Sequence, residues 1–142
     1  MITSHSAIGC ILTAILVVCC VPKDQQIIYR EPSSIRQSKS RLDSMYKDSL
    51  MVFFEQGFNG TLVEIKRQDK VIYQEKFTTA QEIQLATVKN LGYNKEVREF
   101  SIRINNGNEV PIRLKASFKY VAVNYVNDTI YIDFLKYYPM YE

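Results

Sequence analysis

From residue 49 onward, hydrophobic and polar side chains alternate with the period of two that is typical of β-strands with one buried face. The clearest case is the segment 99–104 (EFSIRI), in which Phe100, Ile102 and Ile104 alternate with polar residues. Similar patterns predict further strands at residues 49–55, 60–67, 71–77, 110–115, 119–125 and 129–135. No long helix is indicated in this region.

Short polar segments between these strands predict hairpin turns. Residues 68–70 (QDK), 105–108 (NNGN) and 126–128 (VND) are rich in the Asn, Asp and Gly residues that tolerate positive φ. Pro111 has no backbone N–H to donate to a neighbouring strand. We therefore expect the strand at 110–115 to lie at a sheet edge, or to hold the proline at a non-pairing position.

Residues 78–96 give a weaker signal. Ile83 and Leu85 predict a short edge strand followed by a turn at 90–94, and a helical turn is the alternative. Taken together, short strands at a spacing of about ten residues predict two packed antiparallel sheets. We expect an all-β fold over residues 49–142, a small antiparallel β-sandwich of immunoglobulin-like type with about seven strands. A small open barrel is the alternative.

An uncharged apolar run, AIGCILTAILVVCCV, occupies residues 7–21. A membrane-spanning helix needs about 20 such residues, whereas the core of a signal peptide has about 7–15. The run therefore predicts a signal peptide or membrane anchor at residues 1–20. No Lys or Arg precedes it, although signal peptides usually begin with a basic segment.

A polar segment at residues 21–48 predicts a flexible linker between this leader and the sandwich. Pro32 interrupts it, and few of its side chains are suited to a core. A short helix capped by Ser34, with Ile35 and Leu42 on one face, is the alternative within the linker.

Cysteines occur only in the leader. Cys10, Cys19 and Cys20 are followed by no further cysteine, so no disulfide can stabilise the sandwich. Adjacent cysteines seldom bridge one another, and the single histidine, His5, also lies in the leader. We therefore expect no redox pair, no metal site and no cofactor.

The segment Leu16-Val17-Val18-Cys19 resembles the cleavage box of exported bacterial lipoproteins, in which a leucine stands three positions before the cysteine. Val17 and Val18 are larger than the small residues usual there, and Cys20 lies one position too far from Leu16. The resemblance implies that Cys19 or Cys20 is lipidated and that the chain is tethered to a membrane of the cell envelope. Ordinary apolar cysteines in a leader are the alternative.

Charge and composition exclude several functions. With 18 basic and 15 acidic residues the net charge is +3, too low for the concentrated positive field that nucleic-acid binding needs. The region beyond residue 20 has no His or Cys for a nucleophilic triad, and the five glycines form no phosphate loop. The remaining candidates for acid–base chemistry are four carboxylates on predicted strands: Glu55, Glu64, Glu75 and Asp133. A strand face exposed to solvent explains these carboxylates more simply than catalysis does.

Tyrosines cluster near the C-terminus. Tyr137, Tyr138 and Tyr141 lie in the segment LKYYPMYE and predict a binding surface, because a tyrosine ring combines an apolar body with a polar tip. Packing against the sheet is the alternative.

These patterns favour a non-catalytic, membrane-tethered, exported β-sandwich protein with a binding or structural role at the cell envelope. The expected partners are the membrane and an envelope protein or saccharide. An exported carboxylate-dependent hydrolase is the alternative function.

The leader generates a direct test. Mass spectrometry of the protein from its native cell is expected to find an N-terminus beyond Met1, with an acyl group on Cys19 or Cys20. Soluble protein that retains an unmodified Met1 would contradict both the export and the lipidation hypotheses.

Overall fold

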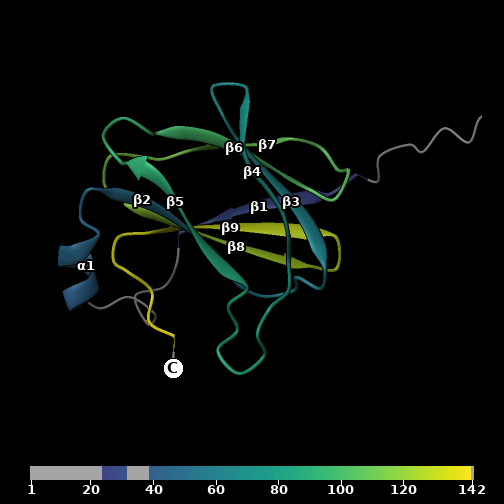
Figure 1. Cartoon of the computed structure of the whole chain (residues 1–142), viewed down its shortest axis with the longest axis horizontal. Helices are drawn as coiled ribbons and strands as arrows, with labels where there is room; N and C mark the ends of the chain where they lie inside the picture. The colour runs from purple at the N-terminus through teal and green to yellow at the C-terminus, as the bar shows by residue number, and fades with distance from the viewer. Residues whose placement is uncertain (1–23, 32–38, 142) are drawn as a thin grey trace, which may run out of the picture.

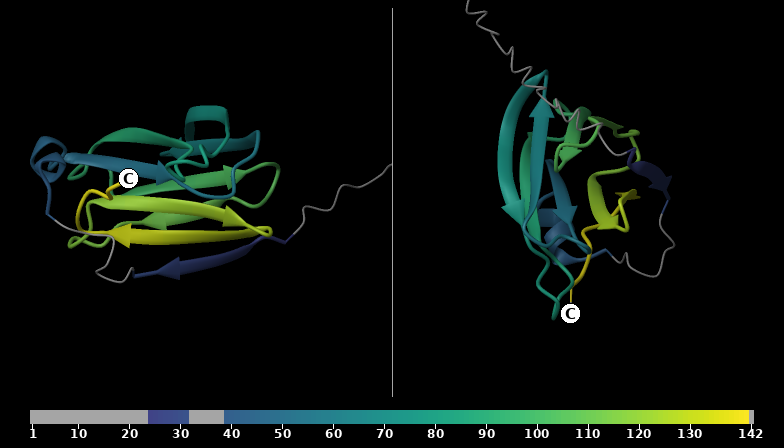
Figure 2. Two further views of the ribbon diagram at one scale, coloured as in Figure 1. Left: turned by 90° about the horizontal axis from the view of Figure 1, so that it is seen from below. Right: turned by 90° about the vertical axis from the view of Figure 1, so that its right-hand side faces the viewer.

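Two β-sheets pack face to face in the computed structural model, which describes residues 24–31 and 39–141. Sheet A has the order β1 (Gln26–Arg30), β9 (Thr129–Leu135), β8 (Tyr120–Val126), β2 (Ser49–Phe54) and β5 (Thr87–Tyr93). Sheet B has the order β4 (Lys70–Phe77), β3 (Thr61–Arg67), β6 (Glu99–Ile104) and β7 (Val110–Arg113). One short helix, α1, spans Arg41–Met45. Figure 1 shows these elements, and Figure 2 shows the sheets as separate layers. The predicted all-β sandwich is confirmed.

The space between the sheets holds the main hydrophobic core. Val63 and Ile65 of β3 and Ile130 and Ile132 of β9 belong to this core, and all four are fully buried. Their neighbours in sequence point to the opposite face of each strand, as the alternation predicts. Burial of each such side chain stabilises the fold by about 1.5–3 kcal/mol.

The predicted hairpins β3–β4, β6–β7 and β8–β9 are all present. Gln68 and Asp69 have φ of 50° and 60°, and Asn127 and Asp128 have φ of 50° and 59°. Two-residue turns with positive φ at both positions match the right-handed twist of the strands that they join. Pro111 lies on β7, which forms an edge of sheet B, as expected.

Sheet A is mixed rather than purely antiparallel. β1 pairs with β9 in parallel, and so does β2 with β8, while the remaining pairs in both sheets are antiparallel. Side chains alternate with the same period in parallel and antiparallel strands, so the sequence pattern does not reveal which pairs are parallel. With nine strands among the described residues and a parallel pair inside sheet A, the topology does not confirm an immunoglobulin-like arrangement.

The folded domain begins earlier than residue 49. Residues 26–30, within the predicted linker, form β1, which lies beside β9 in Figure 2. Arg30 forms a bidentate ion pair with Asp133 at 2.6 Å, and Ile27 packs against the core. Ser40, rather than Ser34, caps the helix of this region; Ser34 and Ile35 lie outside the described residues.

The expected strand at residues 83–87 and turn at 90–94 are wrong. β5 instead occupies Thr87–Tyr93 and pairs with β2. Leu91 and Gly92 together lie opposite Leu50, which makes a β-bulge, and Gly92 adopts φ of 107°. Asn90 and Gly92 suggested a turn because both residues favour turns, but an edge strand accommodates them at such a bulge.

β2 is buried on both of its faces. Leu50, Val52 and Phe54 point into the main core, whereas Met51 and Phe53 point to the other side of sheet A. There they belong to a second hydrophobic group, which we call the outer aromatic cluster: Met51, Phe53, Tyr120, Ala122 and Leu135, with Tyr46, Leu85, Val88, Tyr138 and Tyr141 packed against them.

Gly57, just after β2, lies too close to a neighbouring strand for any side chain. It has φ of +87°, and a Cβ atom built there would lie 1.6 Å from the backbone oxygen of Tyr125. Gly60 also has positive φ, but a Cβ atom there would meet nothing within 4 Å. Alanine substitutions at the two glycines therefore distinguish the cost of the left-handed backbone, present at both, from the cost of the steric clash, present only at Gly57.

We expect Gly60→Ala to lower the free energy of unfolding by about 1–2 kcal/mol, the cost of a left-handed backbone. Gly57→Ala should lower it by a further 1–3 kcal/mol or so, because the clash forces β2 and β8 apart. Urea denaturation of both variants measures the difference. Equal losses would show that the close approach at Gly57 contributes nothing.

Candidate functional site

The C-terminal tail, residues 136–141, runs across the outer aromatic cluster. The ring of Tyr138 makes an edge contact with Phe53, at 5.0 Å between centroids, and stacks on Tyr46 at 5.5 Å. Its backbone N–H donates to the carboxylate of Asp43 in α1. The tail lies close to α1 in Figure 1. Helix and tail thus cover the same face of sheet A.

The three tyrosines predicted to form a binding surface occupy different environments. Tyr138 is half-buried on Phe53, Tyr137 is 39% exposed, and Tyr141 is half-buried with its ring centroid 6.0 Å from that of Phe53. They therefore do not form one continuous exposed patch. Of the three, Tyr141 lines the cavity at the end of β2.

This cavity, which we call the Glu55 hollow, has a volume of about 250 Å³. Three segments line it: the end of β2, the 78–86 loop that projects from the sandwich in Figure 1, and the C-terminal tail. The lining residues are Glu55, Gln56, Glu82, Ile83, Gln84, Pro139, Met140 and Tyr141. Two glutamates and no Lys or Arg are among them.

The side chain of Glu55 is held by two neutral donors. The Tyr141 hydroxyl donates to Oε1 at 2.8 Å, and the Asn124 amide donates to Oε2 at 2.9 Å. The other end of the Asn124 amide is fixed as well, since its oxygen accepts the backbone N–H of Gln56 at 3.1 Å. Glu55 is only 6% exposed.

The backbone around Glu55 is fixed to two other segments. Its N–H donates to the carbonyl of Val123 in β8 at 2.9 Å. Its carbonyl accepts the Thr79 hydroxyl of the 78–86 loop at 2.7 Å, and the same hydroxyl accepts the backbone N–H of Phe58. The carboxylate is therefore held in one position relative to the loop and to β8.

Glu55 was expected on a solvated strand face, and this expectation is wrong. Met51, Phe53 and Glu55 project from the same side of the β2 segment, which would face solvent if the sandwich ended at its two sheets. The tail covers this side, because Tyr138 and Tyr141 pack on Phe53. A segment more than 80 residues away in sequence thus buries the carboxylate.

The other three strand carboxylates have cationic partners. Asp133 pairs with Arg30 at 2.6 Å, Glu75 with Lys89 at 2.8 Å, and Glu64 contacts Lys66 at 3.5 Å. Glu55 has no ion pair within the described part of the chain. It is therefore the most buried member of this set and the one whose charge no neighbouring cation balances.

The rim of the hollow is apolar. Ile83 on the loop is 42% exposed and Met140 on the tail is 55% exposed. A hydrogen bond between the amides of Gln56 and Gln84 joins the end of β2 to the loop. The hollow therefore has an acidic floor, an amide wall and two exposed aliphatic side chains at its mouth.

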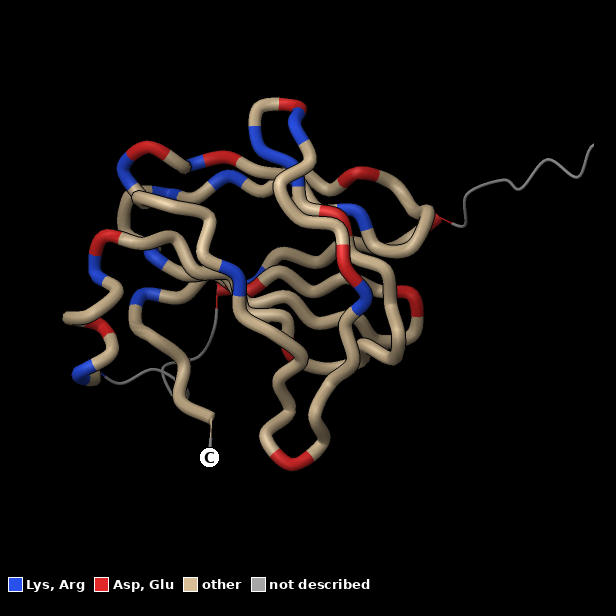
Figure 3. Tube along the Cα trace, viewed as in Figure 1, with Lys and Arg blue, Asp and Glu red and all other residues tan. Residues whose placement is uncertain are grey.

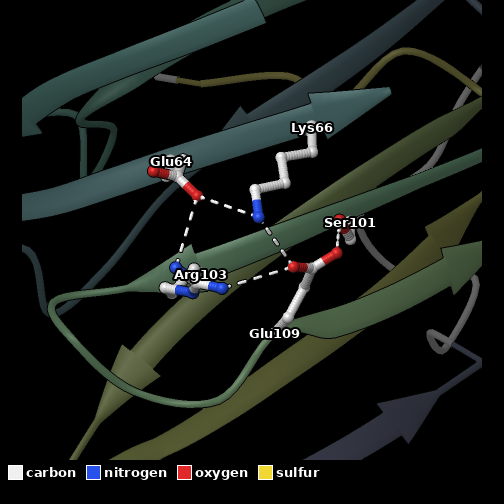
Figure 4. A network of polar contacts seen from close by, with 5 residues as sticks. All are labelled: Glu64, Lys66, Ser101, Arg103 and Glu109. Atoms are coloured by element: carbon white, nitrogen blue, oxygen red, sulfur yellow. Dashed lines mark hydrogen bonds and ion pairs between the residues drawn. The ribbon is translucent and has the colours of Figure 1, made fainter. Parts of the chain in front are cut away.

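A second polar group lies on the outer face of sheet B (Figure 4). Glu109 accepts hydrogen bonds from Ser101 at 2.6 Å and Lys66 at 2.9 Å, and these lower its pKa. The hydrogen bond to Glu109 likewise raises the pKa of Lys66. Arg103 contacts both Glu64 and Glu109. Two cations thus balance two carboxylates, and the group leaves no net charge to attract a ligand.

Basic and acidic residues are interspersed over the described chain (Figure 3). Its residues contain no group of three or more His, Cys, Asp or Glu side chains placed to hold a metal ion. The 105–109 turn, which has the composition of a cation loop, uses its oxygens internally: Asn105 accepts the N–H of Leu62, and Glu109 belongs to the sheet B group.

Among the described residues, no helix is long and apolar enough to cross a membrane. The predicted lipidation sites, Cys19 and Cys20, lie outside those residues. Comparison with protein-family models, with curated proteins and with solved structures gave no significant match.

Sequence reasoning singled out Tyr141 and named Glu55 as a strand carboxylate, but it missed Asn124, the other donor to Glu55. Asn124 carried a usable signal, because it is the one polar residue in the apolar stretch 120–126 (YVAVNYV) apart from tyrosine hydroxyls. A buried amide needs hydrogen-bond partners. Met140 carried no such signal, and Ile83 was expected on a short edge strand but lies on the 78–86 loop.

Tyr120, beneath the tail, has an unusual environment. Its side chain is fully buried, and its hydroxyl has no hydrogen-bond partner among the described residues. Burial is the main cause that raises its pKa, and the nearby Asp43 carboxylate adds to the shift by its charge. The folded protein therefore holds Tyr120 as the neutral phenol beyond the pH at which an unfolded chain ionises.

Because the folded pKa of Tyr120 is the higher one, its contribution to stability is complete below the unfolded pKa of about 10 and is lost at higher pH. We expect Tyr120→Phe to change the free energy of unfolding by less than about 1 kcal/mol at neutral pH. Above about pH 10 the stability of the Tyr120→Phe variant should fall less than that of the wild type, because the variant lacks the phenol that ionises in the unfolded chain. Denaturation curves at neutral and alkaline pH measure both effects, and parallel losses would contradict the assignment.

Proposed function

We propose that this chain is a non-catalytic, membrane-tethered, exported protein of the cell envelope, whose β-sandwich binds a ligand or partner at the Glu55 hollow. The single observation that carries the binding role is the hollow itself. A buried acidic group lies on its floor, and exposed apolar side chains surround its mouth. A concave surface that combines a few fixed polar groups with apolar side chains is typical of ligand sites.

The way in which the hollow is built supports binding. Glu55 is held at both carboxylate oxygens and at both backbone groups by neighbours in sheet A, the loop and the tail. A site whose polar groups are already oriented loses little conformational entropy when a ligand binds. A carboxylate on a solvated strand would have to be ordered by the ligand.

The tether is supported by the sequence alone. The apolar run at residues 7–21 has the length of a signal-peptide core, and Cys19 follows Leu16 at the spacing of a lipoprotein cleavage box. Acyl chains at the N-terminus would add about 0.8 kcal/mol of membrane affinity for each buried methylene group. The sandwich would then be attached to the membrane through the part of the chain that precedes β1.

One observation favours the alternative, an exported carboxylate-dependent hydrolase: Glu55 and Glu82 line the same hollow. Hydrolysis by paired carboxylates requires one of them to protonate the leaving group, while the other activates a water molecule or attacks the carbon from which the leaving group departs. Both oxygens of Glu55 already accept hydrogen bonds from Asn124 and Tyr141, and Glu82 lies on an exposed loop. We therefore prefer a binding role.

Cell fractionation tests the tether and cross-linking tests the site. We expect the wild-type chain in the membrane fraction, and a Cys19→Ser/Cys20→Ser double variant to shift largely to the soluble exported fraction, because it lacks acyl chains. A photoreactive residue in place of Ile83, at the rim of the hollow, should form one defined adduct in intact cells.

The matched control is the same photoreactive residue in place of Arg113, whose side chain is 83% exposed on β7 of the other sheet. Equal labelling from both positions would contradict a binding role for the hollow. Wild-type chain recovered from the cytosol would contradict the tether.

A further inference from the structure

The charge on Glu55 has no cation to balance it within the described residues. Arg30 is near enough for the field of Glu55 to raise its pKa slightly, but Asp133 is the main cause of that shift. The Arg30 guanidinium is bound to Asp133 at both carboxylate oxygens. Transfer of a carboxylate from water into a protein is unfavourable, and two neutral hydrogen bonds offset only part of the cost.

The carboxylate of Glu55 retains capacity to accept further hydrogen bonds. Each oxygen of a carboxylate has two lone pairs, and each oxygen of Glu55 uses one of them, for Tyr141 or for Asn124. One acceptor position therefore remains on each oxygen. A guanidinium group can donate to both oxygens at once, and an ammonium group can donate to either.

The size of the hollow and its apolar rim limit the kind of molecule to which a bound cationic group can belong. A volume of about 250 Å³ lies below the range of about 300–1,000 Å³ that is typical of drug-sized ligands. It suits one side-chain-sized group better than an oligosaccharide. Ile83 and Met140 at the mouth offer apolar surface to an aliphatic stem, which long basic side chains bury while their charged ends bind.

We propose that the Glu55 hollow binds an ammonium or guanidinium group on an aliphatic stem, the chemistry of a lysine or arginine side chain. Glu55 accepts the cation, Glu82 on the loop adds negative field at the entrance, and Ile83 and Met140 contact the stem. This inference rests on the proposed binding role and names the class of group that the hollow accepts. The same cation can come from a free amine or from a basic side chain of a protein partner.

The first test uses ligands that differ only in charge. N-acetylarginine amide and N-acetylcitrulline amide have nearly the same shape, but only the arginine compound is a cation. The full chain in detergent micelles is titrated with each compound and followed by NMR. We expect the arginine compound to shift the signals of Ile83, Met140 and Tyr141, with an affinity at least tenfold higher than that of the citrulline compound. Equal affinities, or shifts elsewhere only, would overturn the proposal.

The second test uses variants of the chain. In Glu55→Gln the new amide can accept from Asn124 through its oxygen and donate to the Tyr141 hydroxyl through its nitrogen, so both hydrogen bonds are kept and only the charge is lost. We expect a loss of at least tenfold in affinity for the arginine compound. The control is Glu75→Gln, which removes an exposed carboxylate on sheet B and should leave the affinity within twofold of wild type.

Should Glu55→Gln fail to fold, the comparison of the two ligands on the wild-type chain decides the question alone. The source of the cation is distinguished by titration with spermidine and with an arginine-containing tripeptide. Tighter binding of the tripeptide indicates a protein partner, and tighter binding of spermidine indicates a free amine.

A neutral disaccharide separates this inference from the proposed function. If the disaccharide shifts the signals of the hollow and the cations do not, the binding role stands and cation selectivity is wrong. If neither kind of ligand shifts them, and cross-linking from Ile83 also fails, the binding role itself is wrong.

Discussion

Burial of both faces of β2 is the constraint on which the rest of the structure depends. One face forms the centre of the core between the sheets, and the other carries Phe53 beneath the C-terminal tail. A sandwich normally leaves the outer face of each sheet to solvent, where Phe53 and Tyr120 would expose a large apolar area. Because α1 and the tail cover this area, they form a third layer on the outer face of sheet A. This layer brings Tyr138 and Tyr141 into the fold.

The same layer creates the candidate site. Glu55 ends the β2 segment just beyond Phe53, so the tail that covers the aromatic cluster also closes over the carboxylate and donates to it from Tyr141. The same segment of the tail therefore packs on the aromatic cluster and positions the Glu55 carboxylate. Asp43 shows the contrasting case, because its buried carboxylate accepts backbone N–H groups of Ser40 and Tyr138 and serves as a helix cap. Glu55 instead accepts side-chain donors from Asn124 and Tyr141, which join β8 and the tail to the end of β2, and among the described residues it has no ion pair.

Sequence reasoning succeeded where structure is decided locally. Alternation placed Val63 and Ile65 in the core, and the residues Asn127-Asp128 predicted the tight turn between the last two strands. It failed where distant contacts override local preference. Gly92 and its neighbours suggested a turn but lie in an edge strand, and the isolated apolar residues of 26–30 suggested a linker but form β1. Each of these segments becomes a strand only because a partner strand supplies its hydrogen bonds.

The sequence by itself determined that this domain is an all-β sandwich and which hairpins it contains, and it left an edge position for β7 as one of two options. These features follow from side-chain period and turn chemistry, which act within a few residues. Only the tertiary structure decided that β1 and β2 pair in parallel with distant strands, and that Glu55 is buried rather than solvated. The contact that buries it joins residues 86 positions apart. No local pattern encodes such a contact, because it depends on how the finished sheets leave one face for the tail to cover.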